Sequence, residues 1–354
     1  MNHLKFKTAV ASMLGAGALL AAAGSAQAAT EYNLEVVTPP EISGSQNAPL
    51  NAINPFGAVI GSAHFPGVPE SQPTIRKDYL RLSIGGDASG KKHKGEALGI
   101  NDLANVVGYM QSTVGGFGLK RPYLWESTSG RELPIFPGEN VVPHAIDNAG
   151  NIVGTAFPSG DQQGPSTAFL YSPSGNLVGL PAVTGGKVAE ANDINENGLV
   201  VGQSDGFATS WPRGVPTKLG ALPGSTSNEA LKSNFGGTAV GDATLPGGEH
   251  RAVVFSGGTA TDLNFPTAGA GADVRANAVN DGGTIVGTGD AKGGSTAVRY
   301  AGGQVVDLNT LIPAGSGLTL RTATDVNNDG QIVGSATPAS DPNAVVGYVL
   351  TPVD

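Results

Sequence analysis

The sequence predicts an all-β protein, a seven-bladed β-propeller of four-stranded antiparallel blades in which an N-terminal strand closes the last blade. Three observations lead to this prediction. One phrase recurs seven times at a spacing of about 46 residues, each end of the chain carries an unmatched strand, and 78 of the 354 residues are glycine or proline. Glycine costs about 1 kcal/mol and proline about 3 kcal/mol in a helix interior, so this composition excludes a helical bundle.

The first 28 residues have the pattern of a cleaved signal peptide. Lys5 and Lys7 precede an uncharged apolar stretch over residues 9–23, and Ala26-Gln27-Ala28 supplies the small residues of a cleavage site. The stretch is shorter than the roughly 20 residues that span a bilayer, and no other segment is long and apolar enough. We therefore expect residues 29–354 to form one propeller domain, exported to the periplasm or the medium, with no membrane span.

Charge and cysteine content exclude several classes of partner and site. Removal of Lys5 and Lys7 leaves 18 basic and 29 acidic residues, a net charge of −11, which disfavours nucleic acid as a partner. Cysteine is absent, so the exported chain has neither disulfides nor a thiolate metal site. We expect a monomer with no cofactor.

The repeated phrase consists of a small residue, an aliphatic, Asn, two or three turn residues, a short aliphatic run and Gly. We call its Asn the repeat Asn and its last residue the closing glycine. The closing glycines are Gly61, Gly108, Gly154, Gly202, Gly241, Gly287 and Gly334. Their regular spacing makes each copy one structural unit.

Each unit contains two hairpins. The phrase forms the first, with turn residues such as Asn197-Gly198 between β-branched runs. The second begins with an aromatic strand, such as Tyr123-Leu124-Trp125, and turns at a glycine. Four short antiparallel strands in about 46 residues are typical of a propeller blade.

The two ends of the chain complete each other. The last unit ends after its aromatic strand at residues 346–350, and residues 32–37 form an orphan strand before the first hairpin. Pairing them removes two exposed edges, so we expect a closed ring rather than an open solenoid.

These phrases resemble the HAF-repeat family of bacterial extracellular repeat proteins, in which an Ile-Asn, turn, Gly, Val-Val-Gly phrase alternates with a His-Ala-Phe-like strand. The closest copy spans residues 191–202, and the resemblance covers about residues 32–352. The aromatic strand departs from the pattern, since only the copy at residues 250–255 keeps a His. The resemblance implies an exported β-propeller and carries over no catalytic residue.

The sequence has no His-Glu-x-x-His motif and no phosphate loop. Gly-x-Ser-x-Gly occurs once, at residues 202–206, where the all-β pattern offers no strand-to-helix turn of the kind that a nucleophile elbow needs. Residues 325–330 resemble the start of a calcium loop, but Ala336 stands where the bidentate Glu is required, so we interpret them as a hairpin turn and expect no metal site. Trp125, Trp211 and Tyr171 could stack on sugars, although packing between sheets explains them more simply.

The first strand of each unit should be innermost and should start at one mouth of the central channel. Four residues before the repeat aliphatic stand Glu96, Glu190, Glu229 and Arg275, with His144 and Arg321 nearby. If these polar groups converge at the mouth of the channel, they form a candidate binding site. The alternative is that they are simply solvated residues at the starts of strands. Ala97, Ala191, Ala230, Ala276 and Ala323, one residue further on, should pack in crowded inner strands.

The first unit is unusually basic. Six of the 18 basic residues of the mature chain lie between Gly61 and Ala97, among them Lys91, Lys92 and Lys94. Such a patch could hold an anionic polymer, or it could be a solvated loop.

The sequence favours a non-catalytic exported propeller that binds an extracellular or cell-surface polymer, for example an anionic polysaccharide, or a surface protein. Two alternatives stay open. One is a uronate-lyase-like enzyme with His144 or Tyr79 as base and Arg275 or Arg321 neutralising a uronate. The other is a purely structural ring.

Overall fold

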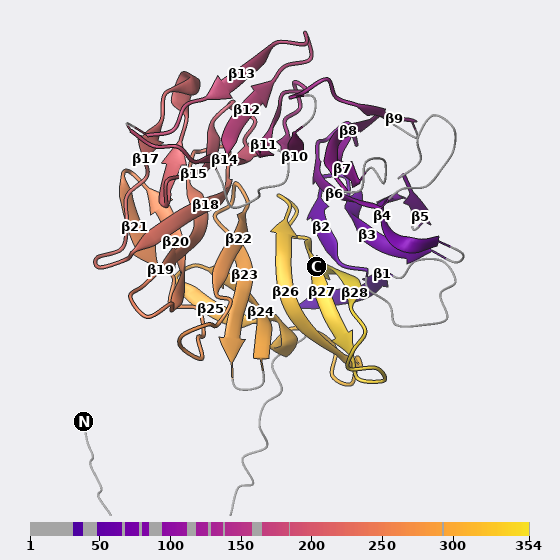
Figure 1. The fold of residues 1–354 in the computed structure, drawn as a ribbon. Coiled ribbons are helices and arrows are strands. Elements are labelled where there is room, and N and C mark those ends of the chain that lie inside the picture. Colours follow the sequence, from indigo (N-terminus) through magenta and orange to yellow (C-terminus); the bar gives the residue numbers. More distant parts are fainter. Residues whose placement is uncertain are drawn as a thin grey trace, which may run out of the picture.

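The computed structural model describes residues 31–37, 48–65, 68–77, 80–84, 94–111, 118–126, 129–136, 139–157, 165–183, 185–291 and 294–353. Residues 1–28, which the sequence predicts to be a signal peptide, lie outside this set. The described residues form seven four-stranded antiparallel sheets, which confirms the predicted propeller. In Figure 1 the seven first strands surround the centre of the molecule.

Six blades follow one another along the chain. Blade 1 contains β2 (Leu50–Ile53), β3 (Val59–Phe65), β4 (Val68–Lys77) and β5 (Leu80–Ser83). Blade 2 contains β6 (Gly95–Ile100), β7 (Val106–Gln111), β8 (Lys120–Glu126) and β9 (Ser129–Glu132). Blade 3 contains β10 (Asn140–Ile146), β11 (Ile152–Phe157), β12 (Thr167–Tyr171) and β13 (Leu177–Leu180).

Blade 4 contains β14 (Ala189–Ile194), β15 (Val200–Ser204), β16 (Phe207–Ser210) and β17 (Thr217–Lys218), with the 3₁₀ turn η1 (Pro212–Gly214) before β17. Blade 5 contains β18 (Ser227–Ser233), β19 (Ala239–Thr244), β20 (His250–Ser256) and β21 (Thr259–Asp262). Blade 6 contains β22 (Arg275–Val279), β23 (Ile285–Ala291), β24 (Gly294–Ala301) and β25 (Gln304–Asp307), followed by η2 (Leu308–Thr310).

Blade 7 joins the two ends of the chain. It contains β26 (Leu318–Val326), β27 (Ile332–Pro338) and β28 (Val346–Pro352), and β1 (Tyr32–Val37) pairs with β28 as its fourth strand. Figure 1 shows β1 beside β28 where the colours of the two chain ends meet. The expected closure is confirmed.

The core lies between blades. One cluster joins Ile60 of blade 1 to Ala97 and Trp125 of blade 2, and another joins Val201 of blade 4 to Phe255 of blade 5. The alanines predicted for crowded inner strands are fully buried. Trp125 and Trp211 are also fully buried, so packing, and not sugar stacking, accounts for them.

Every inner strand has a β-bulge at the same place, three residues before the repeat Asn or, in blade 3, before Asp147. The bulged residues are Asn51, Leu98, His144, Asn192, Leu231, Asn277 and Thr324. A closing glycine lies opposite each bulge, and a Cβ built on any of the seven would come within 2.0–2.2 Å of a carbonyl oxygen of the inner strand. The bulge therefore explains why each phrase ends in glycine.

The repeat Asn binds six of the seven blades to the next one. Its Oδ1 accepts the backbone N–H four residues on, which closes the hairpin turn in all seven blades, Asp147 acting in blade 3. In the other six blades its Nδ2 donates to the carbonyl oxygen of the equivalent residue in the next blade at 2.7–3.2 Å. The side chain of Asp147 is a carboxylate and has no N–H to donate, so this bond is missing between blades 3 and 4.

Candidate functional site

The central channel is a polar cavity of about 330 Å³. Five bulged side chains line its wall and donate to a carbonyl oxygen of the next blade, at 2.8–2.9 Å. Leu98 and Leu231 occupy the two remaining bulges. The side-chain amides of Asn51, Asn192 and Asn277 are thus used in bonds between blades. The main role of the channel wall is therefore to connect neighbouring blades.

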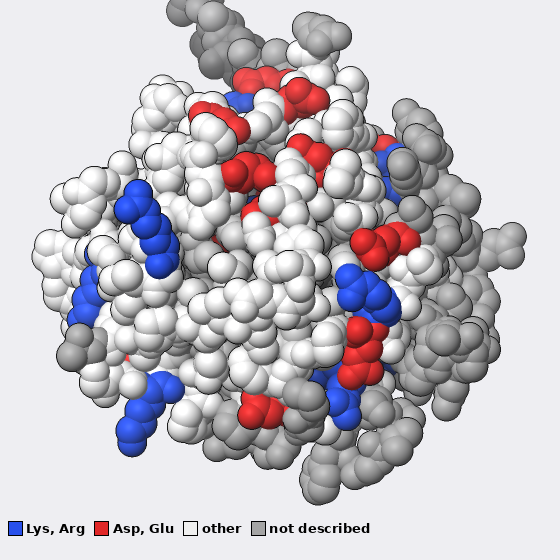
Figure 2. Space-filling view, turned by 90° about the horizontal axis from the view of Figure 1, so that it is seen from above, with Lys and Arg blue, Asp and Glu red and all other residues white. Residues whose placement is uncertain are grey.

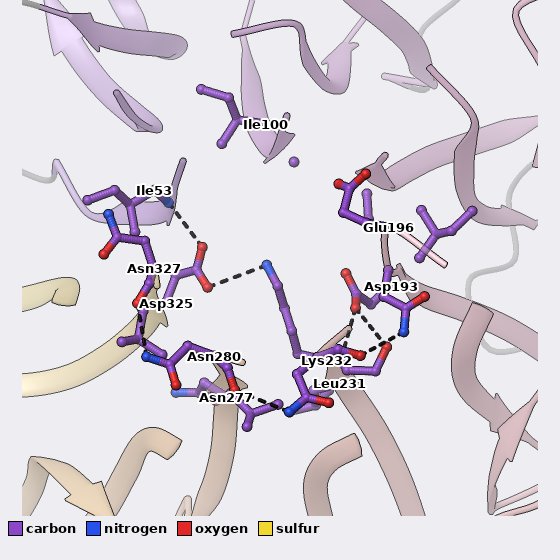
Figure 3. Close-up of a pocket in the computed structure, with 18 of the residues that line it drawn as sticks. Ile53, Ile100, Asp193, Glu196, Leu231, Lys232, Asn277, Asn280, Asp325 and Asn327 are labelled. Carbon is purple, nitrogen blue, oxygen red and sulfur yellow. Dashed lines mark hydrogen bonds and ion pairs between the residues drawn. The ribbon is translucent and has the colours of Figure 1, made fainter. Parts of the chain in front are cut away.

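At one position of the inner strands, three of the seven blades carry a charged side chain that faces the channel. The residue before the repeat aliphatic is alanine or glycine in four blades and Asp193, Lys232 and Asp325 in the others. The partly exposed Lys232 Nζ lies 3.4 Å from Oδ1 of the buried Asp325. Figure 3 shows Lys232 extending across the cavity toward Asp325, with Asp193 close by.

Both aspartates also bind the next blade. Asp193 Oδ2 accepts the Ser233 N–H at 2.9 Å, and Asp325 Oδ2 accepts the Ile53 N–H at 3.0 Å. Burial lowers the pKa of Lys232, but the carboxylates of Asp325 and Asp193 outweigh this effect and the pKa is raised. Burial raises the pKa of Asp193, against the opposing effects of Lys232 and the Ser233 N–H. These groups therefore form an internal ion cluster that fills part of the channel.

The predicted mouth residues fall into separate environments. Glu229 accepts Asn192 Nδ2 at 2.7 Å, and its carboxyl interacts electrostatically with Glu190 and Arg275, so these three share one region of blades 4, 5 and 6. Arg275 Nε donates to Asp273 at 2.7 Å. Glu96, in blade 2, accepts Asn51 Nδ2 at 3.0 Å and the Tyr109 hydroxyl at 3.2 Å.

His144 belongs to the channel wall. Its Nδ1 donates to the Ala191 carbonyl oxygen at 2.8 Å, and burial lowers its pKa. Lys94 is exposed. Tyr79, Lys91 and Lys92 lie outside the described residues.

Arg321 does not join the channel residues. It lies in a groove between blades 6 and 7, where its Nε donates to Thr337 Oγ1 at 3.3 Å and its Nη1 to the Ser295 carbonyl oxygen at 3.4 Å. The pairing of β26 with β27 slips between Leu320 and Thr322, an irregularity that the other inner strands lack. Arg321 is the residue skipped, so counting back from Val326 assigns its side chain to the wrong place.

This blade 6–7 groove has a volume of about 860 Å³ and was not recognised in the sequence. Five hydroxyl side chains line it besides Arg321, those of Ser295, Thr296, Thr310, Ser316 and Thr319. Its loop and 3₁₀ turn join β25 to β26, and the glycine-rich composition of residues 313–317 was the signal in the sequence that could have marked it.

The base of the groove is held rigidly. Asp307 Oδ1 accepts hydrogen bonds from Thr296 Oγ1 and from the backbone and side-chain nitrogens of Asn309, at 2.9–3.0 Å. Asn309 also exchanges two hydrogen bonds with the Leu320 backbone. Among the described residues that line the groove, Asp307 is the only carboxylate and is engaged by internal donors, and Arg321 contributes a positive charge to the lining.

Charge is sparse over the rest of the surface. Figure 2 shows one side of the molecule, which is mostly uncharged, with several acidic side chains gathered in the upper part of the view and acidic and basic side chains next to one another at its right. Within the described residues there is no group of three His, Cys, Asp or Glu side chains that could hold a metal ion. No helix of the described chain is long and apolar enough to cross a membrane.

Comparisons with known proteins support the fold alone. No family model and no curated protein sequence matches the chain. Three solved structures resemble it at TM-scores of 0.51–0.52. The β-propeller domain of the Trilobed protease from Pyrococcus furiosus is 10% identical, with 87% of this chain and 94% of that one covered. Virginiamycin B lyase from Staphylococcus aureus is 9% identical, with 91% and 100% covered. Acylaminoacyl peptidase from Pyrococcus horikoshii is 10% identical, with 88% and 52% covered. At such low identity these relatives establish a β-propeller and no activity.

Proposed function

We propose that the protein is an exported, non-catalytic propeller that binds an acidic polysaccharide, with the ligand in the blade 6–7 groove. One observation carries the proposal, namely a groove of about 860 Å³ that is lined by five hydroxyl side chains and by Arg321. Hydroxyls exchange hydrogen bonds with sugar hydroxyls, and a guanidinium binds a carboxylate through charge-assisted hydrogen bonds. The groove has the size of a small-molecule site, so it would hold a short stretch of the polymer. We assign the chain to the HAF-repeat proteins that its phrases resemble.

The positions of the candidate residues favour polysaccharide binding over a uronate-lyase reaction. A lyase would need a base and a charge-neutralising group on the same uronate. Of the predicted pairs of base and arginine, His144 and Arg321 face different cavities, since His144 lines the central channel and Arg321 lines the groove. The other predicted base, Tyr79, lies outside the described residues.

The experiment is affinity electrophoresis in gels that contain polygalacturonate, with a neutral glucan as reference. We expect polygalacturonate to retard the mature protein and the glucan to leave its mobility unchanged. Arg321→Gln should weaken binding roughly tenfold or more, because it removes a charge-assisted contact. Arg213→Gln is the matched control, since it removes one positive charge from an exposed site in η1.

Three outcomes would contradict the proposal. Formation of an unsaturated uronate product would show a lyase. Retardation that survives Arg321→Gln but is lost when Lys91, Lys92 and Lys94 are neutralised would place the ligand on blade 1. If the protein migrates equally in gels with and without polygalacturonate, it does not bind this polymer, and the structural ring is the remaining alternative.

A further inference from the structure

A cluster of carboxyl groups lies between blades 4 and 5, outside the proposed groove. Glu229 in β18 and Asp242 in β19 are directly opposite each other, so both side chains are on the same face of blade 5. That face meets blade 4, because Asn192 of β14 donates to Glu229 Oε1 at 2.7 Å.

Asp242 is buried and only half satisfied. Its Oδ2 lies 3.2 Å from His250 Nδ1 of β20, whereas its Oδ1 is inaccessible to solvent and has no hydrogen-bond partner among the described residues. A buried carboxylate oxygen without a partner is costly, so it calls for a donor. The described residues offer no three-ligand metal site that would supply a cation here.

A proton on Glu229 would supply that donor. We propose that Glu229 and Asp242 share one proton and form a pH-sensitive contact between blades 4 and 5. In the protonated pair the Glu229 O–H donates to Asp242 Oδ1, and the pair carries a single negative charge. When the proton leaves, two carboxylates face each other in a buried place and the contact loosens.

The surroundings of Glu229 support this arrangement. The pKa of Glu229 is raised to about 7, chiefly by burial, with further contributions from Asp242 and from Glu190 of β14, while Asn192 and Arg275 of β22 oppose the shift. The folded protein therefore keeps a proton that the unfolded chain releases near pH 4.5. Stability should fall as pH rises between these two values, and the fall should end above about pH 7.

Blade 2 offers a matched control. Glu96 occupies the same repeat position and accepts Asn51 Nδ2 as Glu229 accepts Asn192 Nδ2, but Tyr109 stands opposite it instead of an aspartate. Glu96→Gln therefore removes an equivalent carboxyl that has no acidic partner.

The first test is the thermal midpoint of unfolding from about pH 5 to about pH 8. The wild-type midpoint should fall by roughly 2–4 °C over this range beyond the change seen in Glu229→Gln. Asp242→Asn should lose the same part of the pH dependence, and Glu96→Gln should keep it. Equal slopes in wild type and Glu229→Gln would overturn the proposal, as would an equal loss in Glu96→Gln.

The second test does not depend on stability. Carboxyl ¹³C resonances of the folded wild-type protein should include one that titrates near neutral pH and is missing from Glu229→Gln. If every carboxyl resonance titrates in the ordinary acidic range, no proton is shared and the proposal is wrong. Either result is independent of polysaccharide binding, because Arg321 belongs to another groove.

Discussion

The repeat Asn shows how one side chain serves two neighbours. Its oxygen closes the turn of its own hairpin, and its nitrogen binds the next blade. Of the side chains of similar size, only an amide can accept and donate in this way, which explains why Asn recurs in the phrase. Asp147 keeps the first contact and loses the second.

Substitutions at this position should change stability in opposite directions. Asn280→Asp removes the donor to the Asn327 carbonyl oxygen, and we expect the free energy of unfolding to fall by about 1–3 kcal/mol. Asp147→Asn should restore the missing donor between blades 3 and 4 and raise that free energy by up to about 1 kcal/mol. Urea denaturation measures both.

Asn176→Asp is the control for the added charge, because Asn176 is exposed in the β12–β13 turn. It should change the free energy of unfolding by less than about 0.5 kcal/mol. A similar loss in Asn176→Asp and Asn280→Asp would attribute the effect to charge instead of the bond.

Residues also mark the limit of what the sequence predicts. The recurrence of Asn and Gly was visible, but their contacts to other blades were not, because these depend on how the sheets pack. Glu190, Glu229 and Arg275 share one strand position and interact electrostatically. Arg321 was predicted to lie near them and does not, because a local slip in β26 changes where its side chain points.

Strand β1 does more than fill an edge. Glu31, just before it, forms an ion pair with Arg299 of blade 6 at 3.0 Å, and Glu35 within it forms an ion pair with Arg76 of blade 1. Tyr32 is buried in blade 7 and its hydroxyl accepts a hydrogen bond from Arg299. The N-terminal strand therefore connects three consecutive blades.

Removal of this strand should open the ring. A chain that begins at residue 48 would expose the edge of β28 and the apolar residues that Tyr32 covers. We expect a lower thermal midpoint and concentration-dependent association, measured by calorimetry and light scattering. The mature chain from residue 29 is the control. A monomer that melts at the same temperature without β1 would show that closure contributes little.

At the scale of the whole molecule, the fold could be predicted because each unit repeats the same local sequence pattern. Strand, turn and closing glycine recur seven times, and the unmatched strands at the two ends indicate closure. The blade 6–7 groove could not be predicted in this way, because an irregular loop outside the phrase builds it. The proposed binding site is such a departure from the repeat, as expected where a site is added to a common fold.

Export is the prediction that concerns the entire chain. We expect the protein from the periplasm or medium of a bacterial host to begin at Ala29, as intact mass spectrometry would measure. Replacement of Ala26 and Ala28 by larger residues should block cleavage and retain the longer form. Recovery of the full 354-residue chain from the cytoplasm would contradict the prediction.

The repeat Asn has a consequence for how such proteins change in evolution. Each Asn makes its bonds only within its own unit and to the next one, so duplication or loss of a whole unit would leave the pattern of these bonds unchanged. The number of copies is set instead by how tightly neighbouring sheets pack around the circle. Gain or loss of one whole unit by recombination would therefore keep the side-chain bonds between blades, and the packing of neighbouring sheets would have to adjust.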